Sequence, residues 1–176
     1  MAETKKDAIA LLKADHRRVE GLFESFKSAH QADRKATLAK EICTELTVHC
    51  ITEEEIFYPA CKGNVEDDKM AEAYVEHDGA KVLIAEIEAS GPDDRFFDAK
   101  VNVLSEDIKH HVKEGEARIE GMFAQAKKAG VDLTDLGARL MARKQELVAR
   151  FKSERLPPPE TRSFTGHELK EGTPVD

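Results

Sequence analysis

Residues 49–59 read His49-Cys50-Ile51-Thr52-Glu53-Glu54-Glu55-Ile56-Phe57-Tyr58-Pro59. His49 and Glu53 are four residues apart, and residues at this spacing lie on the same face of a helix. Both fall on a seam of otherwise apolar residues, so the sequence predicts that an imidazole and a carboxylate enter the protein core together. A metal ion between helices is the simplest reason to bury such a pair.

Apolar residues recur at alternating spacings of three and four in four stretches of the chain, which predicts four amphipathic helices. We expect helices from Thr4 or Asp7 to about Ala29, from about Asp33 to Tyr58, from about Glu66 to Ala89, and from Asp93 or Asp94 through Ile119 and Met122 to a break at Gly130. A fifth helix, capped by Thr134, should reach about Lys152. Four helices with short connections are typical of an up-down bundle.

The predicted fold class is therefore all-α. We expect an up-down four-helix bundle over residues 1–130, an additional C-terminal helix over residues 131–155, and a disordered, flexible tail over residues 156–176. The composition of 40% hydrophobic and 35% charged residues without Trp favours amphipathic helices over a β-sandwich. The tail begins with Pro157-Pro158-Pro159 and has little apolar surface to bury. His167 lies in it and is not expected to be functional.

Charge and cysteine usage limit the partners and the compartment. A formal net charge of -8 argues against binding to nucleic acid or to an anionic membrane. The N-terminus lacks the apolar run of a secretory signal, and no stretch approaches the roughly 20 apolar residues of a membrane helix. Cys43, Cys50 and Cys61 are expected to be reduced, buried thiols in a cytoplasmic protein, although Cys50 beside His49 is an alternative redox-active residue. No protein partner is indicated.

Four of the 7 histidines fall on the predicted seams, one in each bundle helix: His16, His49, His77 and His111. A single histidine on an apolar face is usually a hydrogen-bonded core residue, but burying four without a shared partner would cost about 1–3 kcal/mol each. A bound cation removes that cost. Imidazole and carboxylate ligands without thiolates favour iron, manganese or zinc. At least six candidate ligands, and a carboxylate that can bridge, favour two iron ions.

At these residues the sequence resembles the hemerythrin-like, or HHE cation-binding, family. The resemblance rests on Asp15-His16, the stretch from His49 to Pro59, Glu76-His77, and His110-His111-Val112-Lys113-Glu114-Gly115-Glu116. It implies a four-helix bundle around a non-haem di-iron centre that reacts with oxygen or related small ligands. His16 precedes His49 by 33 residues, and His77 precedes His111 by 34 residues, as if one helical hairpin were used twice.

The sequence departs from this family pattern at two positions. Ala73 stands where oxygen-carrying hemerythrins have a second histidine on the third helix, which would leave one iron with an open position. Tyr74 could fill that position, or it could be an ordinary packed tyrosine. Gly115 stands four residues after His111, where the His49–Glu53 spacing would place a carboxylate. The second bridging ligand would then be Glu114 or Glu116.

Other polar residues near the histidines have simpler expected roles. Glu54 and Glu55 are expected on a solvated face. His110 could make an outer hydrogen bond or be exposed. Three acids that flank ligand histidines could orient the imidazole rings, namely Asp15, Glu20 and Asp78.

The predicted function is that of a non-haem di-iron protein that binds or reacts with dioxygen, nitric oxide or peroxide in an oxygen or stress response. His16, His49, His77 and His111 would donate one nitrogen each, and Glu53 with Glu114 or Glu116 would bridge the ions. The alternatives are a di-iron enzyme with peroxidase-like or nitric-oxide-reducing activity, an iron donor in iron-centre repair, and a metal-free structural bundle.

Overall fold

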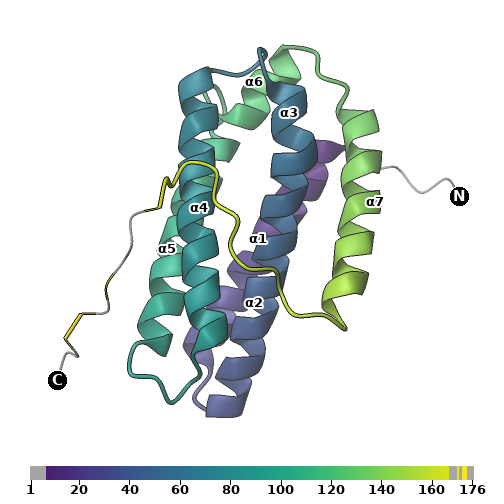
Figure 1. Cartoon of the computed structure of the whole chain (residues 1–176). Helices are drawn as coiled ribbons and strands as arrows, with labels where there is room; N and C mark the ends of the chain where they lie inside the picture. Colours follow the sequence, from purple (N-terminus) through teal and green to yellow (C-terminus); the bar gives the residue numbers. More distant parts are fainter. Residues whose placement is uncertain (1–6, 167–169, 171, 174–176) are drawn as a thin grey trace, which may run out of the picture.

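The computed structural model describes residues 7–166, 170, 172 and 173. Within these residues the chain forms helices, turns and loops but no strand. The helices α1 (Ala8–Ser28) and α2 (Ala32–Thr52) form one antiparallel hairpin, and α4 (Asp67–Ala89) and α5 (Phe97–Glu116) form a second (Figure 1). The two hairpins pack side by side, which confirms the predicted four-helix bundle.

The helix α2 runs without a break through a π-helical segment, η1 (Glu53–Phe57), into α3 (Tyr58–Cys61). The backbone N–H of Tyr58 donates to the carbonyl oxygen of Glu53, five residues earlier. The predicted end at Tyr58 is therefore too early. Pro59 lies in the first turn of α3, a position where the missing N–H of proline is tolerated.

The predicted fourth helix is two helices, α5 and α6 (Met122–Lys128). Between them the chain turns so tightly that a Cβ atom on Gly121 would lie 2.5 Å from the carbonyl oxygen of Ala117. Ile119, expected on the seam, lies in this turn and is 86% exposed, whereas Met122 is buried. The prediction for Ile119 is wrong because the helical periodicity stops at Glu116.

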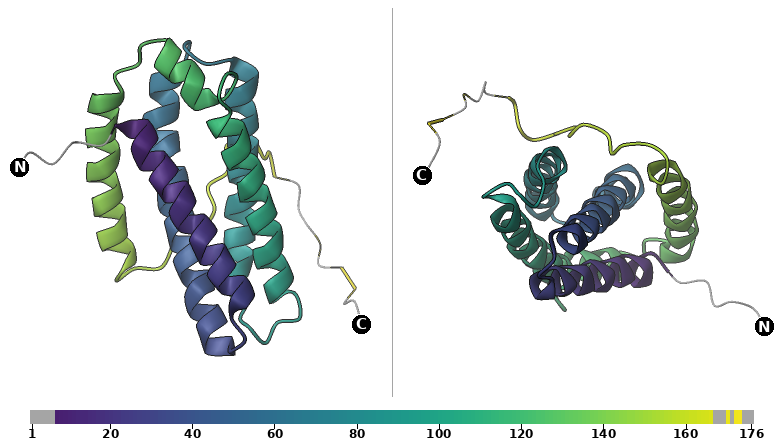
Figure 2. Two further views of the ribbon diagram at one scale, coloured as in Figure 1. Left: turned by 180° about the vertical axis from the view of Figure 1, so that it is seen from behind. Right: turned by 90° about the horizontal axis from the view of Figure 1, so that it is seen from below.

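The final helix, α7 (Leu133–Phe151), lies alongside α1 and α2 (Figure 2). Its cap is the Asp132 carboxylate, which accepts hydrogen bonds from the backbone N–H groups of Thr134 and Asp135. The predicted cap at Thr134 is wrong, but the predicted apolar residues of this helix are all buried: Leu136, Leu140, Leu147 and Phe151. The division of the chain at residues 130 and 155 stays a prediction.

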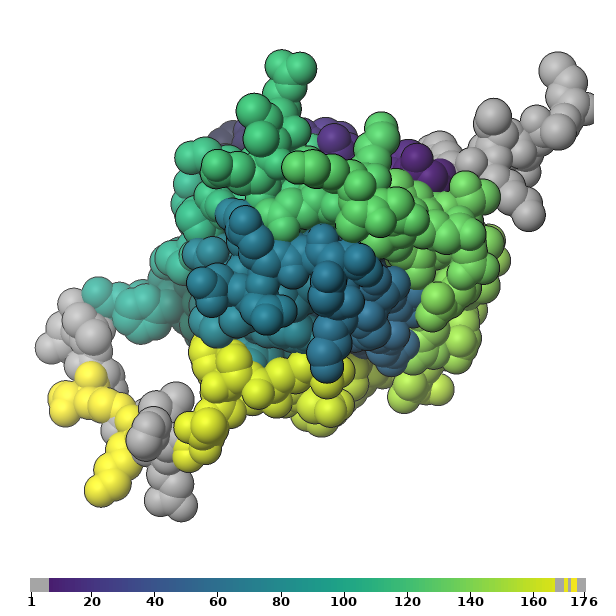
Figure 3. Space-filling model, turned by 90° about the horizontal axis from the view of Figure 1, so that it is seen from above, coloured from purple at the N-terminus to yellow at the C-terminus, as the bar shows by residue number. Residues whose placement is uncertain are grey.

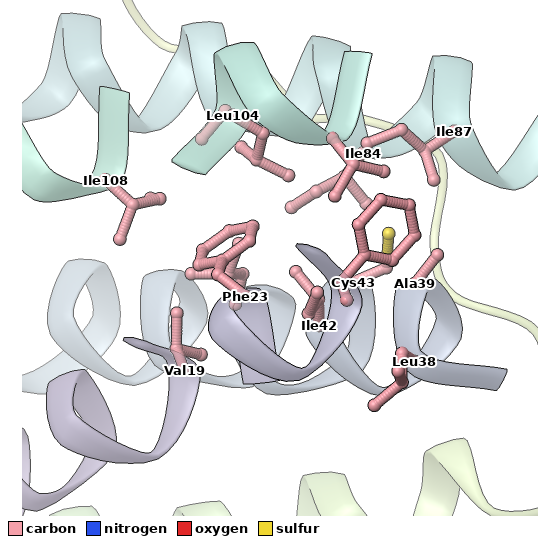
Figure 4. Packing of buried hydrophobic residues seen from close by; sticks show 14 of the residues in the cluster. Val19, Phe23, Leu38, Ala39, Ile42, Cys43, Ile84, Ile87, Leu104 and Ile108 are labelled. Carbon is pink, nitrogen blue, oxygen red and sulfur yellow. The ribbon is translucent and has the colours of Figure 1, made fainter. Parts of the chain in front are cut away.

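Two apolar clusters fill the two ends of the bundle. Figure 4 shows the larger one, built from α1, α2, α4 and α5 around residues such as Phe23 and Leu104. In the other cluster, Leu12 of α1 and Phe57 of η1 belong to the same group of buried residues as Phe123 of α6. His16 lies between Leu12 and Val19, that is, between the two clusters. The seam histidines thus form a polar layer between two apolar cores.

The segment after α7 crosses the face of the bundle formed by α2 and α4 (Figures 1 and 3). Leu156 packs against both the larger cluster and a small cluster around Leu147. Further on, the backbone N–H groups of Arg162 and Ser163 bond to Asp78. The first part of the predicted flexible tail therefore has defined contacts that its composition did not suggest, whereas His167 lies outside the described residues.

All three cysteines are free and buried, as predicted. Among the described residues, no helix combines the length and the apolar character needed to cross a membrane.

Candidate metal centre

The four seam histidines come from α1, α2, α4 and α5, and their side chains meet inside the bundle. Each is 8% exposed or less. The Nε2 atoms of His16 and His49 lie 3.3 Å apart. Ligand atoms of four predicted site residues fall within 4.8 Å of one another, namely His16, His49, Glu53 and His111. His77 completes the group through Glu53 and lies 4.8 Å from His111 between ring centroids.

Glu53 lies at the centre of the histidines. Its Oε2 atom is 3.3 Å from Nε2 of His49, 3.3 Å from Nε2 of His77 and 3.6 Å from Nε2 of His111. Burial alone would raise the pKa of this carboxyl, but the surrounding imidazoles hold it well below its usual value. Glu53 is therefore an ionised carboxylate inside the core.

The π-helical segment explains a site residue that sequence reasoning missed. In an α-helix, residues five apart point in different directions, whereas the i to i+5 bonds of a π turn bring them onto one face. The Tyr58 hydroxyl accordingly donates to Glu53 Oε2 at 2.8 Å and lies 3.1 Å from His77 Nε2. Burial and the charge of Glu53 raise the pKa of Tyr58 well above its usual value, so the hydroxyl keeps its proton. No signal at the 3.6-residue period could have identified Tyr58.

Each histidine has a carboxylate on its outer side. The Nδ1 atoms of His16, His77 and His111 lie 2.7, 3.1 and 2.7 Å from carboxylate oxygens of Glu116, Glu54 and Glu76. The Nδ1 atom of His49 lies 3.9 Å from Asp15. A carboxylate on Nδ1 holds the ring in place and leaves Nε2 directed inward, which is how metal-ligating histidines are usually oriented.

The sequence prediction for Glu54 is wrong. It was expected on a solvated face, but it is 7% exposed and contacts His77 and Lys81. The π turn changes the phase of the helix at this point, so Glu54 faces α4. Glu55 is exposed, as expected, and pairs with Arg143 at 2.7 Å.

The predicted orienting acids divide into one that faces a ring and two that do not. Asp15 faces His49 and pairs with Lys144. Glu20 pairs instead with Arg17 at 3.3 Å. Asp78 is fully buried and bonds to the C-terminal segment.

The two candidate bridging carboxylates of α5 lie in different places. Glu116 is on the outer side of His16 and also bonds Arg17 at 2.7 Å. Glu114 is half-buried and lines a small pocket that reaches the histidine cluster. Among the described residues, Glu53 is thus the carboxylate that contacts the inward nitrogens.

Tyr74 and His110 have ordinary surroundings. The ring of Tyr74 packs edge-on against Tyr58 with centroids 5.2 Å apart, which agrees with the interpretation as a packed tyrosine. The His110 side chain is 57% exposed, and its Nε2 atom lies 3.4 Å from Glu76.

The electrostatics distinguish the two histidines of the first hairpin. Burial and the neighbouring His49 lower the pKa of His16 to about 4. Burial would also lower the pKa of His49, but Glu53 and Asp15 raise it to about 10. His49 therefore carries a proton beside the Glu53 carboxylate, whose Oε2 atom lies 3.3 Å from its Nε2 atom. A cation at this point would displace that proton.

A pocket of about 30 Å³ connects the cluster to the surface between α4 and α5. Ala73 and Gly115, the two departures from the family pattern, both line it. A single water molecule needs about 10–15 Å³ of such space. The small residues therefore leave room for a molecule of only a few atoms next to His111 and Glu53.

The spacing of the donor atoms fits a bound cation. With metal–nitrogen bonds of about 2.1 Å, neighbouring ligand atoms lie roughly 3.0–3.4 Å apart. Three contacts among the inward atoms are 3.3 Å, within this range, and the fourth, between His111 and Glu53, is slightly longer at 3.6 Å. Ring centroids are 4.8 Å apart within each hairpin and 6.2–6.3 Å apart for His16–His111, His49–His77 and His49–His111. The histidines thus form two pairs on either side of Glu53.

Comparisons with known proteins identify the fold and the family. A structure of a hemerythrin HHE cation-binding domain-containing protein from Mycobacterium kansasii superposes with a TM-score of 0.70 at 19% identity, covering 85% of this chain and 94% of that one. A DNA nickase of Nostoc sp. is 26% identical over 109 residues, which are 62% of this chain but only 31% of that protein. The model of the hemerythrin HHE cation binding domain matches residues 7–123. The chain belongs to the hemerythrin HHE cation-binding domain family.

Proposed function

We propose that this chain is a non-haem di-iron protein that binds or reacts with dioxygen, nitric oxide or peroxide. The observation that carries the proposal is the convergence of three buried Nε2 atoms on one ionised carboxylate, Glu53, with the Nε2 atom of His16 beside that of His49. Imidazole and carboxylate donors suit iron, and the buried ligand group contains no thiolate among the described residues. The two histidine pairs support two ions rather than one.

In this proposal His16 and His49 would hold one ion, His77 and His111 would hold the other, and Glu53 would be shared by both. Iron, when bound, supplies the electrons that reduce oxygen or peroxide. Glu114 or Glu116 stays the predicted second bridging carboxylate, and the position of Glu114 in the pocket lining favours Glu114. Glu116 orients His16, because reaching the inner site would require it to leave both His16 and Arg17.

The surrounding residues govern what reaches the centre and hold a proton beside it. The apolar clusters on both sides exclude bulk water, and the pocket at Ala73 and Gly115 admits only small molecules. The Tyr58 hydroxyl holds its proton 2.8 Å from Glu53 and can donate a hydrogen bond to a small ligand bound there.

The proposal is tested by metal analysis followed by rapid mixing. Protein from iron-supplemented cells should contain about two iron atoms per chain, and His49→Ala should lower that content. Stopped-flow mixing of the ferrous protein with oxygen should give a change in the optical spectrum. A long-lived oxygenated spectrum indicates binding, and rapid conversion to a ferric product indicates the alternative functions, a di-iron enzyme or an iron donor. Less than about one metal per chain, unchanged by His49→Ala, overturns the proposal.

The remaining expectations concern location and partners. Three free, buried cysteines support a reducing, cytoplasmic compartment. The relative that is named a DNA nickase is about three times longer than the matched region, and the net charge of -8 argues against nucleic acid or an anionic membrane as a partner of this chain.

A further inference from the structure

The segment that follows α7 is fastened to α4 at a buried acid. The backbone N–H groups of Arg162 and Ser163 donate to Asp78 Oδ2 at 2.8 and 2.6 Å, and the Ser163 hydroxyl donates to the same atom at 2.6 Å. Lys81 adds a bond to the carbonyl oxygen of Glu160 at 3.0 Å. These contacts hold residues 160–163 across the α2–α4 face (Figure 3).

Fastened in this way, the Arg162 side chain reaches the outer side of the metal centre. Its Nε atom donates to Glu54 Oε2 at 2.6 Å. The other oxygen of that carboxylate, Oε1, lies 3.1 Å from Nδ1 of His77. A continuous series of contacts therefore runs from the C-terminal segment through Glu54 to an inward-facing histidine.

Arg162 and Lys81 bond to different oxygens of the Glu54 carboxylate, so their roles differ. Lys81 also pairs with Glu54, at 2.6 Å, but with Oε1, the oxygen that faces His77. Arg162 holds Oε2. Without Arg162, Lys81 and His77 would both bond to Oε1 of Glu54. Among the described residues, no other contact with Oε2 would then keep the Glu54 carboxylate from rotating.

The other outer carboxylates are also backed by a basic group. Glu116 pairs with Arg17, Asp15 with Lys144, and Glu76 lies beside His110. Those basic groups belong to helices. Arg162 comes from a segment outside them, so the orientation of His77 depends on how that segment is docked.

We propose that Arg162 is a positioning residue of the metal centre, which holds Glu54 against Nδ1 of His77 and so keeps Nε2 of His77 directed at Glu53. The proposal rests on the metal centre proposed above. Outer partners of metal ligands typically change metal affinity by about 10- to 100-fold when they are removed. Because Arg162 acts on His77 only through Glu54, and because Lys81 remains, we expect the lower end of this range.

The test compares three variants of the full chain. Arg162→Gln removes the charge, Arg162→Lys restores it without the planar group, and Ser163→Ala removes one anchoring bond while leaving Arg162 in place. Cobalt(II) titration followed by its visible spectrum measures affinity and ligand geometry. In the metal-free protein, NMR measures the solvent exchange of the Nδ1 protons of His77 and His111.

Arg162→Gln should weaken cobalt binding about tenfold, alter the spectrum, and speed exchange at His77 but not at His111. Arg162→Lys should recover part of the affinity, and Ser163→Ala should resemble the wild type. Wild-type affinity and His77 exchange in Arg162→Gln would overturn the inference. Weaker cobalt binding in Arg162→Gln with unchanged exchange at His77 would also overturn it, since the effect would then not pass through His77. If the wild type binds no cobalt, the metal proposal fails, and the exchange measurement still decides the role of Arg162.

Discussion

Each helical hairpin contributes two histidines to the site, but the residues around the two pairs differ. His16 and His49 in the first hairpin, and His77 and His111 in the second, are each 4.8 Å apart between ring centroids. The first hairpin adds a buried carboxylate, Glu53, through the π-helical segment. The second has Gly115 at the matching position and opens a pocket there. The first hairpin therefore supplies the carboxylate that both histidine pairs share, and the second supplies the pocket through which small molecules can enter.

Replacing Glu53 should have the largest effect, because it removes the carboxylate that both hairpins share. Glu53→Ala leaves buried imidazoles without their counter-charge, and breaking a buried ion pair costs roughly 3–5 kcal/mol. Urea denaturation of the metal-free protein should show that loss. Glu55→Ala, which removes an exposed acid two residues away, is the control and should change stability by less than about 1 kcal/mol. Equal stability of the two variants would contradict the central role of Glu53.

Removing one histidine should separate the two hairpins as metal sites. His49→Ala and His111→Ala should each lower the iron content from about two ions to about one, because each variant keeps one of the two histidine pairs intact. His30→Ala is the control, since this histidine is exposed in the connection between α1 and α2 and should leave the iron content unchanged. Complete loss of iron in both single variants would show that the pairs do not act as separate sites.

Filling the pocket should affect access more than stability. A Cβ atom on Gly115 meets nothing within 4 Å, so Gly115→Val should fold, with a stability change within about 1 kcal/mol. Its side chain would narrow the pocket, and the stopped-flow reaction of the ferrous protein with peroxide should slow, more for an alkyl hydroperoxide than for hydrogen peroxide. Gly21→Val, at another open helical glycine far from the pocket, controls for the loss of glycine. Unchanged rates in Gly115→Val would place the entrance elsewhere.

The smallest effect is expected at Cys50, which belongs to the first hairpin and lies beside His77. Cys50→Ala should keep the iron content of the wild type, because the ligands are imidazoles and carboxylates. Its unfolding free energy should fall by about 1 kcal/mol, as for a typical buried substitution. Loss of iron in this variant would show that a thiolate takes part.

The same contrast separates what the sequence could predict from what it could not. The 3.6-residue period placed His16, His49, His77 and His111 on core seams, and the structure brings all four together. It failed where the helix changes its period. The π turn places Tyr58 in the site and Glu54 in the core, and neither position can be predicted from α-helical spacing.

Long-range contacts account for the other differences. Glu116 bonds His16 from 100 residues away, and Arg162 bonds Glu54 from 108 residues away. The proline-rich composition of residues 157–159 indicated a free tail, because composition does not register a few strong bonds to a buried acid such as Asp78. Ile119 became exposed because Gly121 permits a tight turn that the apolar spacing does not reveal.

Iron anomalous scattering from crystals of the iron-loaded protein tests the central claim most directly. Two-metal sites typically hold their ions about 3.5–4 Å apart. We predict two iron peaks at about that separation, one beside His16 and His49 and one beside His77 and His111, with Glu53 between them. A single peak at the centre of the four histidines, or no peak among them, would contradict it.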